Sequence, residues 1–143
     1  MKNNYHLFLK LIILLTMLCF TNYSNANPAT QFEMPFGLTL APNTRIVDVA
    51  QYNVGTIKEA NGRLATKKTA REVVSFYERE LQAKGFIIAS KTDTAKRVSI
   101  VAKRGKGDFF SLSDYGDDFG LEPGETELRI IIRYAPVNAP VAP

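Results

Sequence analysis

The apolar residues between positions 69 and 86 recur at the spacing of an α-helix. Five of them would lie on one side of that helix: Ala70, Val73, Val74, Tyr77 and Leu81. Thr69 and Glu72 form a Thr-x-x-Glu capping box, which predicts the first turn. Gly85 is the kind of residue that commonly ends a helix in a left-handed conformation, and Phe86 can fold back onto the last turn. The pattern therefore predicts one amphipathic helix that buries its apolar side.

Alternation of apolar and polar residues predicts β-strands on both sides of this helix. The clearest strand covers residues 126–134, where apolar residues occupy every second position. Shorter runs predict six more strands, at residues 45–52, 54–59, 63–67, 86–90, 97–103 and 109–115. Asn61-Gly62 lies between two of these runs, and this dipeptide predicts a tight hairpin turn.

These elements together predict the fold class. Short connections between the later strands favour antiparallel pairing. One helix is enough to cover one face of such a sheet. We therefore expect an α+β fold, a two-layer domain with one main amphipathic helix packed on a mostly antiparallel sheet.

The first 26 residues have the pattern of a secretory signal peptide. Lys2 and Lys10 make the start basic, an apolar run covers residues 11–20, and Ser24-Asn25-Ala26 supplies small residues before a cleavage point at Asn27. The apolar run is shorter than the roughly 20 residues that span a bilayer. We therefore expect export, to the periplasm of a Gram-negative bacterium, with no stable membrane span after cleavage.

The rest of the chain divides into three parts. Residues 27–43 carry three prolines and are expected to form an extended lead-in. Residues 44–135 hold all the predicted strands and the helix, so they are expected to form a single α+β domain. Residues 136–143 form a Pro-rich tail.

Composition excludes several kinds of site from the exported chain. The 143-residue sequence has one Cys and one His, and both Cys19 and His6 lie in the predicted signal peptide. The remainder would have no disulfide, no Ser-His-Asp triad and no Cys/His zinc site, and we expect no cofactor. Its net charge falls from +4 to +2 because Lys2 and Lys10 are removed. This near-neutral charge argues against nucleic acid as a partner.

Basic residues near the later strands form the first candidate site. If these strands pair, one outer sheet face gathers cations around a small apolar centre. The candidate partner-binding residues are Arg97, Lys103, Arg129, Ile131 and Arg133. Such a face suits an acidic protein or an anionic envelope component, and its apolar centre would also suit a homodimer. The ordinary alternative is a charged outer face that prevents aggregation.

An acidic loop before the last strand is the candidate metal site. Its carboxylates are Asp114, Asp117, Asp118 and Glu122, followed by Glu125. Calcium prefers several oxygen ligands of this kind. The spacing does not match an EF-hand loop, so a solvated acidic loop is the competing interpretation.

Two resemblances connect these patterns to known families. The stretches LAPNTRIVDVA and LATKKTAREVVSFYERELQAKGF, within residues 40–90, resemble small exported bacterial domains of uncharacterised function. Those domains share a Thr/Ser-capped helix with Val-x-x-Phe-Tyr and a Gly-aromatic exit, and the resemblance implies no catalytic residues. SFYERELQAKGF with its following strands also resembles the βαβββ unit of glyoxalase-like domains. Such domains use His and Glu on paired units to bind metal, whereas this chain has room for one unit and no His after residue 26.

The sequence therefore favours a non-catalytic binding or accessory module that uses the outer sheet face. One alternative is a small-ligand binder with a pocket between helix and sheet, near Tyr77 and the Phe109-Phe110 pair. Another is a hydrolase that uses two carboxylates as acid and nucleophile.

Overall fold

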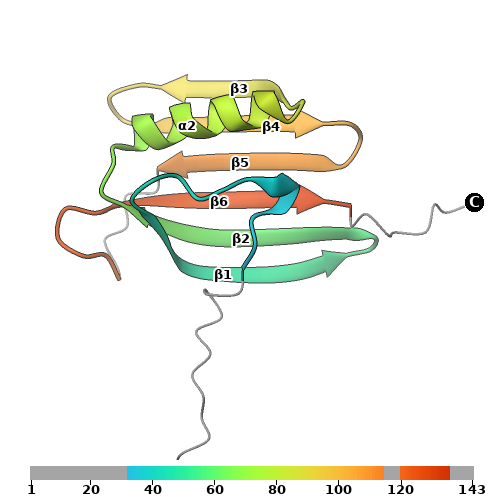
Figure 1. The fold of residues 1–143 in the computed structure, drawn as a ribbon, viewed down its shortest axis with the longest axis horizontal. Helices are drawn as coiled ribbons and strands as arrows, with labels where there is room; N and C mark the ends of the chain where they lie inside the picture. The colour runs from blue at the N-terminus through green and yellow to red at the C-terminus, as the bar shows by residue number, and fades with distance from the viewer. Residues whose placement is uncertain (1–31, 115–119, 136–143) are drawn as a thin grey trace, which may run out of the picture.

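The computed structural model describes residues 32–114 and 120–135, which form one helix on one six-stranded sheet (Figure 1). In chain order, the elements are η2 (Pro35–Gly37), β1 (Thr44–Val54), β2 (Ile57–Thr66), α2 (Ala70–Ala83), β3 (Ile87–Asp93), β4 (Val98–Arg104), β5 (Asp108–Asp114) and β6 (Thr126–Tyr134). The strand order is β1-β2-β6-β5-β4-β3, and every neighbouring pair is antiparallel. The predicted two-layer α+β class is confirmed. Within the described residues, no helix combines the length and hydropathy that a bilayer span needs.

Both ends of α2 form as the local sequence predicts. The Thr69 hydroxyl accepts a hydrogen bond from the Glu72 N–H at 3.3 Å, and the Glu72 carboxylate accepts one from the Thr69 N–H at 2.9 Å. At the other end Gly85 has φ 78°, and the Phe86 N–H donates to the Leu81 carbonyl at 2.9 Å. These bonds use peptide groups that have no partner inside the helix.

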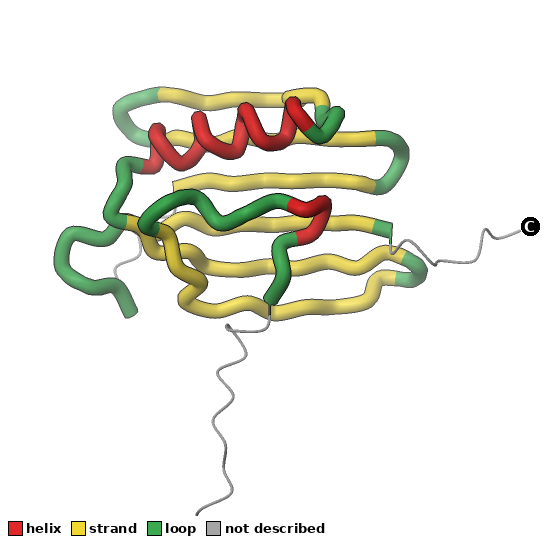
Figure 2. The backbone as a smooth tube through the Cα atoms, in the orientation of Figure 1, coloured by secondary structure: helices red, strands yellow, loops and turns green. Residues whose placement is uncertain are grey.

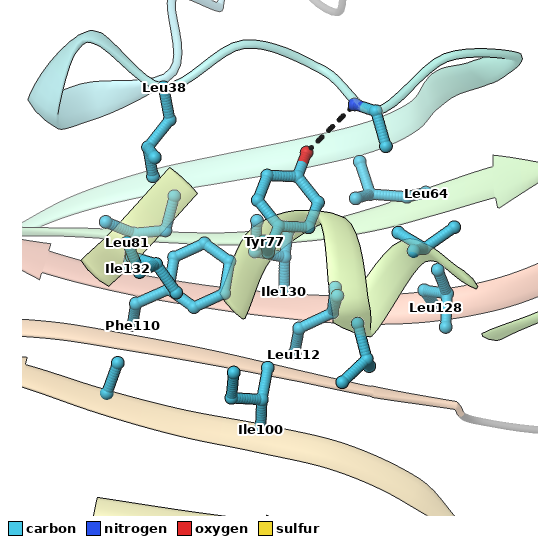
Figure 3. Packing of buried hydrophobic residues seen from close by; sticks show 14 of the residues in the cluster. Leu38, Leu64, Tyr77, Leu81, Ile100, Phe110, Leu112, Leu128, Ile130 and Ile132 are labelled. Atoms are coloured by element: carbon cyan, nitrogen blue, oxygen red, sulfur yellow. Dashed lines mark hydrogen bonds between the residues drawn. The ribbon is translucent and has the colours of Figure 1, made fainter. Parts of the chain in front are cut away.

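The apolar side of α2 packs on one face of the sheet and forms the core (Figure 3). The helix contacts β4, β3 and β5. Tyr77 and Phe110 are fully buried, and their ring centroids lie 5.3 Å apart. Burying an aliphatic or aromatic side chain of this size contributes about 1.5–3 kcal/mol. The core therefore fixes the helix over the β3–β5 half of the sheet.

A second segment, residues 32–43, crosses the same face beside the helix (Figures 1 and 2), and we call it the N-terminal strap. Leu38 and Ala41 of the strap are buried in the core. The Ala41 N–H donates to the Tyr77 hydroxyl at 3.3 Å, the dashed line in Figure 3. The Lys67 N–H donates to the Asn43 carbonyl at 3.2 Å. The described part of the predicted lead-in is thus packed against the domain.

The predicted hairpin turn at Asn61-Gly62 is wrong. Both residues lie inside β2, so the two short strands expected on either side of them are one strand. The turn instead consists of Gly55 and Thr56, and Gly55 has φ 63°. A two-residue hairpin turn needs a residue with positive φ. Gly55 meets this need, so the turn does not require the Asn-Gly dipeptide.

Gly62 has a different function, which is to allow close packing. A Cβ atom at this position would lie 3.1 Å from the Asp48 carbonyl oxygen and 3.2 Å from Cγ2 of Ile130. The pairing of β1 with β2 shifts register between Ile46 and Asp48, directly beside this contact. A strand glycine beside a bulge commonly marks such a close backbone approach.

Candidate functional site

The face of the sheet opposite α2, which we call the open face, carries three rows of side chains that run across all six strands. The first row is Tyr52, Glu59, Arg133, Phe109, Lys103 and Ile87. The central row is Ala50, Asn61, Ile131, Ser111, Val101 and Ser90. The third row is Asp48, Arg63, Arg129, Ser113, Ser99 and Thr92.

The structure brings four of the five predicted partner-binding residues onto this face. Arg129, Ile131 and Arg133 follow one another at alternate positions of β6, and Lys103 lies two strands away on β4. Arg97 lies apart from them, in the turn before β4, where its carbonyl accepts a hydrogen bond from the Thr94 N–H. The antiparallel register therefore assembles the cluster without Arg97.

The first row shows that the open face is not uniformly basic. Glu59 accepts a hydrogen bond from Arg133. This bond, opposed by partial burial, lowers the pKa of the Glu59 carboxyl. The Arg133 guanidinium also lies over the Phe109 ring, 5.3 Å from its centroid. Arg133 is therefore held between a carboxylate and an aromatic ring.

The third row contains a second ion-pair network, centred on Arg63. Its guanidinium donates to Glu127 at 2.6 and 2.9 Å and to Asp48 at 3.0 Å. The side chain of Glu127 is fully buried, whereas that of Asp48 is 54% exposed. The hydrogen bond to Glu127 is the main cause of the raised pKa of Arg63. A buried carboxylate needs such a partner because water no longer solvates it.

Arg63, Glu59 and Asn61 lie on this face although the sequence patterns predict no site at them. The predicted hairpin divides their strand into two, so it assigns their side chains to no common face. Once residues 57–66 are recognised as one strand, alternation places all three on one common face, and pairing with β6 makes it the open face.

A hollow of about 360 Å³ lies between the two ion-pair networks, over β1, β2 and β6. The side chains around it include Asp48, Tyr52, Asn61, Arg63, Arg129 and Ile131. Two of the predicted partner-binding residues, Arg129 and Ile131, therefore take part in it. Tyr52 lies on the edge strand β1 and is 47% exposed.

Asn61 is the distinctive polar group of this hollow. Its Nδ2 donates to the Glu59 carboxylate at 3.0 Å. Because a carboxylate only accepts, this bond fixes the orientation of the amide. The Oδ1 atom is buried, and within the part of the chain that the structure describes it has no hydrogen-bond partner. Burying an acceptor without a partner costs stability.

A second hollow, of about 390 Å³, lies where the strap meets the first half of α2. Phe76 and Pro42 contribute apolar surface, and Lys68, Arg71 and Arg79 contribute charge. Arg71 is paired with Asp93 at 2.6 Å, and Lys68 with Glu72 at 3.2 Å.

The pocket predicted near Tyr77 and the Phe109-Phe110 pair is not formed by these side chains. Consecutive strand residues point to opposite faces. Phe110 is buried against Tyr77, whereas Phe109 lies on the open face beside Arg133. Burial raises the pKa of Tyr77 to about 12, as expected for a phenol that fills the core.

The acidic loop is only partly described, because Asp117 and Asp118 lie outside the described residues. Asp114 accepts a hydrogen bond from the Val98 N–H at 3.1 Å. Across residues 32–114 and 120–135, no group of three or more His, Cys, Asp or Glu side chains is arranged to hold a metal ion.

The other two acids of this loop, Glu122 and Glu125, come after residues 115–119 and contact basic residues of and after the β1–β2 hairpin. Glu125 binds Arg45 at 2.7 and 3.0 Å, and this contact lowers the pKa of Glu125. Glu122 lies 3.9 Å from Lys67. The calcium site stays a prediction.

Comparison with known proteins gives one similarity. A family model described as START domain-like matches residues 46–109. The match starts in β1, includes α2 and ends in β5, and it covers somewhat less than half of the chain. The chain is similar to that family over this stretch. No curated protein and no solved structure matches it. The resemblance to small exported domains, within residues 40–90, overlaps the matched residues. That the protein is exported stays a prediction.

Proposed function

We propose that this protein is an exported, non-catalytic binding module that holds an anionic ligand or an acidic partner on the open face of its sheet. The observation that carries the proposal is the hollow on that face, between two networks of arginines and carboxylates. The similarity to a START domain-like family supports a ligand-binding role. The signal-peptide pattern of residues 1–26 supports export to the periplasm.

The charges of the open face favour an anion as the bound group. Arg129 lines the hollow and is exposed. Arg63 lies beside it in the adjacent strand, in register with Arg129. Guanidinium groups bind carboxylates and phosphates through paired N–H donors. A ligand anion at this position would lie next to Arg129, beside the ion pairs that Arg63 makes with Glu127 and Asp48.

The carboxylates of the open face favour binding over hydrolysis. Glu59 is paired with Arg133, and Asp48 and Glu127 are paired with Arg63. A general acid near neutral pH needs a raised pKa, whereas the pKa of Glu59 is lowered. These side chains are arranged as ion pairs, not as the acid and nucleophile of a hydrolase.

A second candidate function is a binder of small apolar ligands. It rests on the hollow between the strap and α2, which includes Phe76 and Pro42. This site replaces the pocket that the sequence predicted deeper in the core.

Charge reversal distinguishes the two candidates. We would titrate the purified protein with an acidic peptide of glutamate residues and with inorganic phosphate, and follow backbone amide shifts by NMR. Shifts around β2 and β6 that disappear in Arg129→Glu/Arg133→Glu, but persist in the control Lys106→Glu, would support the open face. Lys106 is exposed in the β4–β5 turn. Shifts of strap and α2 amides on addition of a small apolar probe such as indole, unchanged by the double substitution, would support the second candidate. Absence of any shift would contradict the anion-binding proposal.

A further inference from the structure

The sheet has two outer strands, β1 and β3, and only β3 is protected against pairing with another chain. Lys91 of β3 pairs with Glu78 of α2 at 2.7 Å, and Asp93 pairs with Arg71 at 2.6 Å. A register shift also interrupts the first half of β3. Bulges and lysines on an edge strand are common devices that prevent the addition of a further strand.

The second half of β1 lacks these devices. Its pairing with β2 runs from Asp48 to Val54 without a shift, and residues 49–54 contain no charged residue and no proline. Tyr52 and Val54 are two of the three large apolar side chains that the described part of the chain leaves exposed. Among residues 32–114 and 120–135, no strand pairs with the outer edge of β1 (Figure 1). A regular edge of this kind is a template for another strand.

Backbone alternation decides which peptide groups this edge offers. The turn after β1 has two residues, so Val54 and Ile57 flank it and face each other. The pair that flanks such a turn exchanges hydrogen bonds within the hairpin, and every second residue from there directs its N–H and C=O outward. The outward residues are therefore Val49, Gln51 and Asn53, each with one donor and one acceptor.

A second copy of β1 complements this edge in charge. In an antiparallel pair with Gln51 of one copy opposite Gln51 of the other, Asp48 of each copy meets Val54 of the other. Asp48 is the only charged residue between positions 46 and 54, so no like charges face each other across the pair. Such a pair has twofold symmetry, in which the same surface serves both copies.

The same register also matches the side chains in size. Ala50 of each copy meets Tyr52 of the other, so a large aromatic side chain lies opposite a small one. Ala50 and Tyr52 both line the hollow on the open face. The pairing therefore brings Tyr52 of the other copy to the rim of each hollow.

We infer that two copies of this chain pair through the outer edges of β1, with Gln51 at the twofold axis. The pairing joins two six-stranded sheets into one continuous sheet. This inference goes beyond the proposed function, because it concerns an edge of the sheet and holds whatever the open face binds.

Disulfide trapping tests the contact and its register together. The chain has one cysteine, so the full chain carries Cys19→Ser and one added cysteine. Gln51→Cys places two thiols at a hydrogen-bonded pair, where Cα atoms lie about 5.5 Å apart and a disulfide can form. Asn53→Cys is the matched control, because its two copies lie four residues out of register, about 13 Å apart. With oxidised glutathione, we expect a covalent dimer from Gln51→Cys and a monomer from Asn53→Cys.

Analytical ultracentrifugation measures the association without a covalent link. Gln51→Pro removes an N–H that faces away from β2, a position at which edge strands tolerate proline. We expect it to weaken association about tenfold or more, since both copies lose a hydrogen bond at the axis. Gln51→Lys keeps the backbone and places like charges opposite each other, so it should weaken association about threefold. Ile87→Lys is the control on β3, where Ile87 is 74% exposed, and it should have no effect.

The outcomes decide the inference separately from the proposed function. A dimer that Gln51→Pro and Gln51→Lys weaken, and that Gln51→Cys locks, supports it. A monomer at the concentrations of an NMR sample overturns it, as does a dimer that neither substitution at Gln51 weakens. Equal trapping through Asn53→Cys, or loss of the dimer in Ile87→Lys, overturns it as well. None of these results changes the anion titration of the open face, which tests the proposed function alone.

Discussion

The two faces of this sheet use the same six strands in opposite ways. The face under α2 and the strap is filled with apolar side chains, and most of its members are fully buried. The open face carries rows of charged, small polar and a few apolar residues, and a hollow remains between them. The inner face therefore supplies most of the stability through burial. The open face is free to differ in composition without unfolding the domain, as a binding surface requires.

The adjacent phenylalanines of β5 give the largest contrast between the faces. Phe110 is fully buried on the inner face, and Phe109 is partly exposed on the open face. We expect Phe110→Ala to lower the free energy of unfolding by about 4 kcal/mol, because it removes buried surface and leaves a cavity. Phe109→Ala should cost only about 1 kcal/mol, mainly its contact with Arg133.

Urea denaturation of the two variants measures this difference. Equal losses would show that the open face contributes to the core as much as the inner face does. Unequal losses, with the same slope of unfolding free energy against urea concentration in both variants, would confirm that the contrast lies in the folded state.

The buried carboxylate of Glu127 is the main exception to the contrast, since it lies on the charged side of the sheet yet is fully buried. Leaving such a group without its partner costs about 3 kcal/mol or more. We therefore expect Arg63→Gln to be strongly destabilising. The double variant Arg63→Met/Glu127→Leu should recover most of the loss, because no unpaired charge remains buried.

Thermal melting of the single and double variants tests this explanation. If the double variant melts as low as Arg63→Gln, the loss comes from packing of the Arg63 stem. The open face would then contribute more to stability than its contrast with the inner face implies.

The smallest expected effect concerns the helix that covers the inner face. Thr69→Ala should cost about 1 kcal/mol, the usual value of a helix N-cap. An unchanged denaturation midpoint would contradict the role of the cap.

The same cap predicts a dependence on pH. The hydrogen bond from the Thr69 N–H is the main cause that lowers the pKa of Glu72 to about 2, from an ordinary value of 4.5. A lowered pKa stabilises the folded state above the ordinary value and ceases to do so as the pH falls toward the folded value. The difference in melting temperature between the protein and its Glu72→Gln variant should therefore be present at pH 7 and decrease between pH 4.5 and 2. A difference independent of pH would exclude the charged cap.

The fold class could be predicted because its signals are local. The capping box, the apolar stripe and Gly85 act within one helix, and the alternation of residues 126–134 acts within one strand. The hairpin was misplaced because Asn61-Gly62 has the composition of a turn. Its conformation depends on contacts with β1 and β6, which are distant in sequence.

The candidate site could be predicted only in part for the same reason. Arg129, Ile131 and Arg133 share a strand, so alternation placed them on one face. Arg63 and Glu59 came to that face through pairing of β2 with β6, and their carboxylate and guanidinium partners turned an expected basic surface into a network of ion pairs.

By itself the sequence determined one capped helix, alternating strands and the absence of Cys and His beyond residue 26, because these are properties of neighbouring residues and of composition. Only the tertiary structure decided that residues 57–66 form one central strand, that the strap shares the core, and that Asn61 faces a hollow between Arg129 and Tyr52. Strand pairing decides these features, since the register between distant segments sets which side chains meet and which face they share.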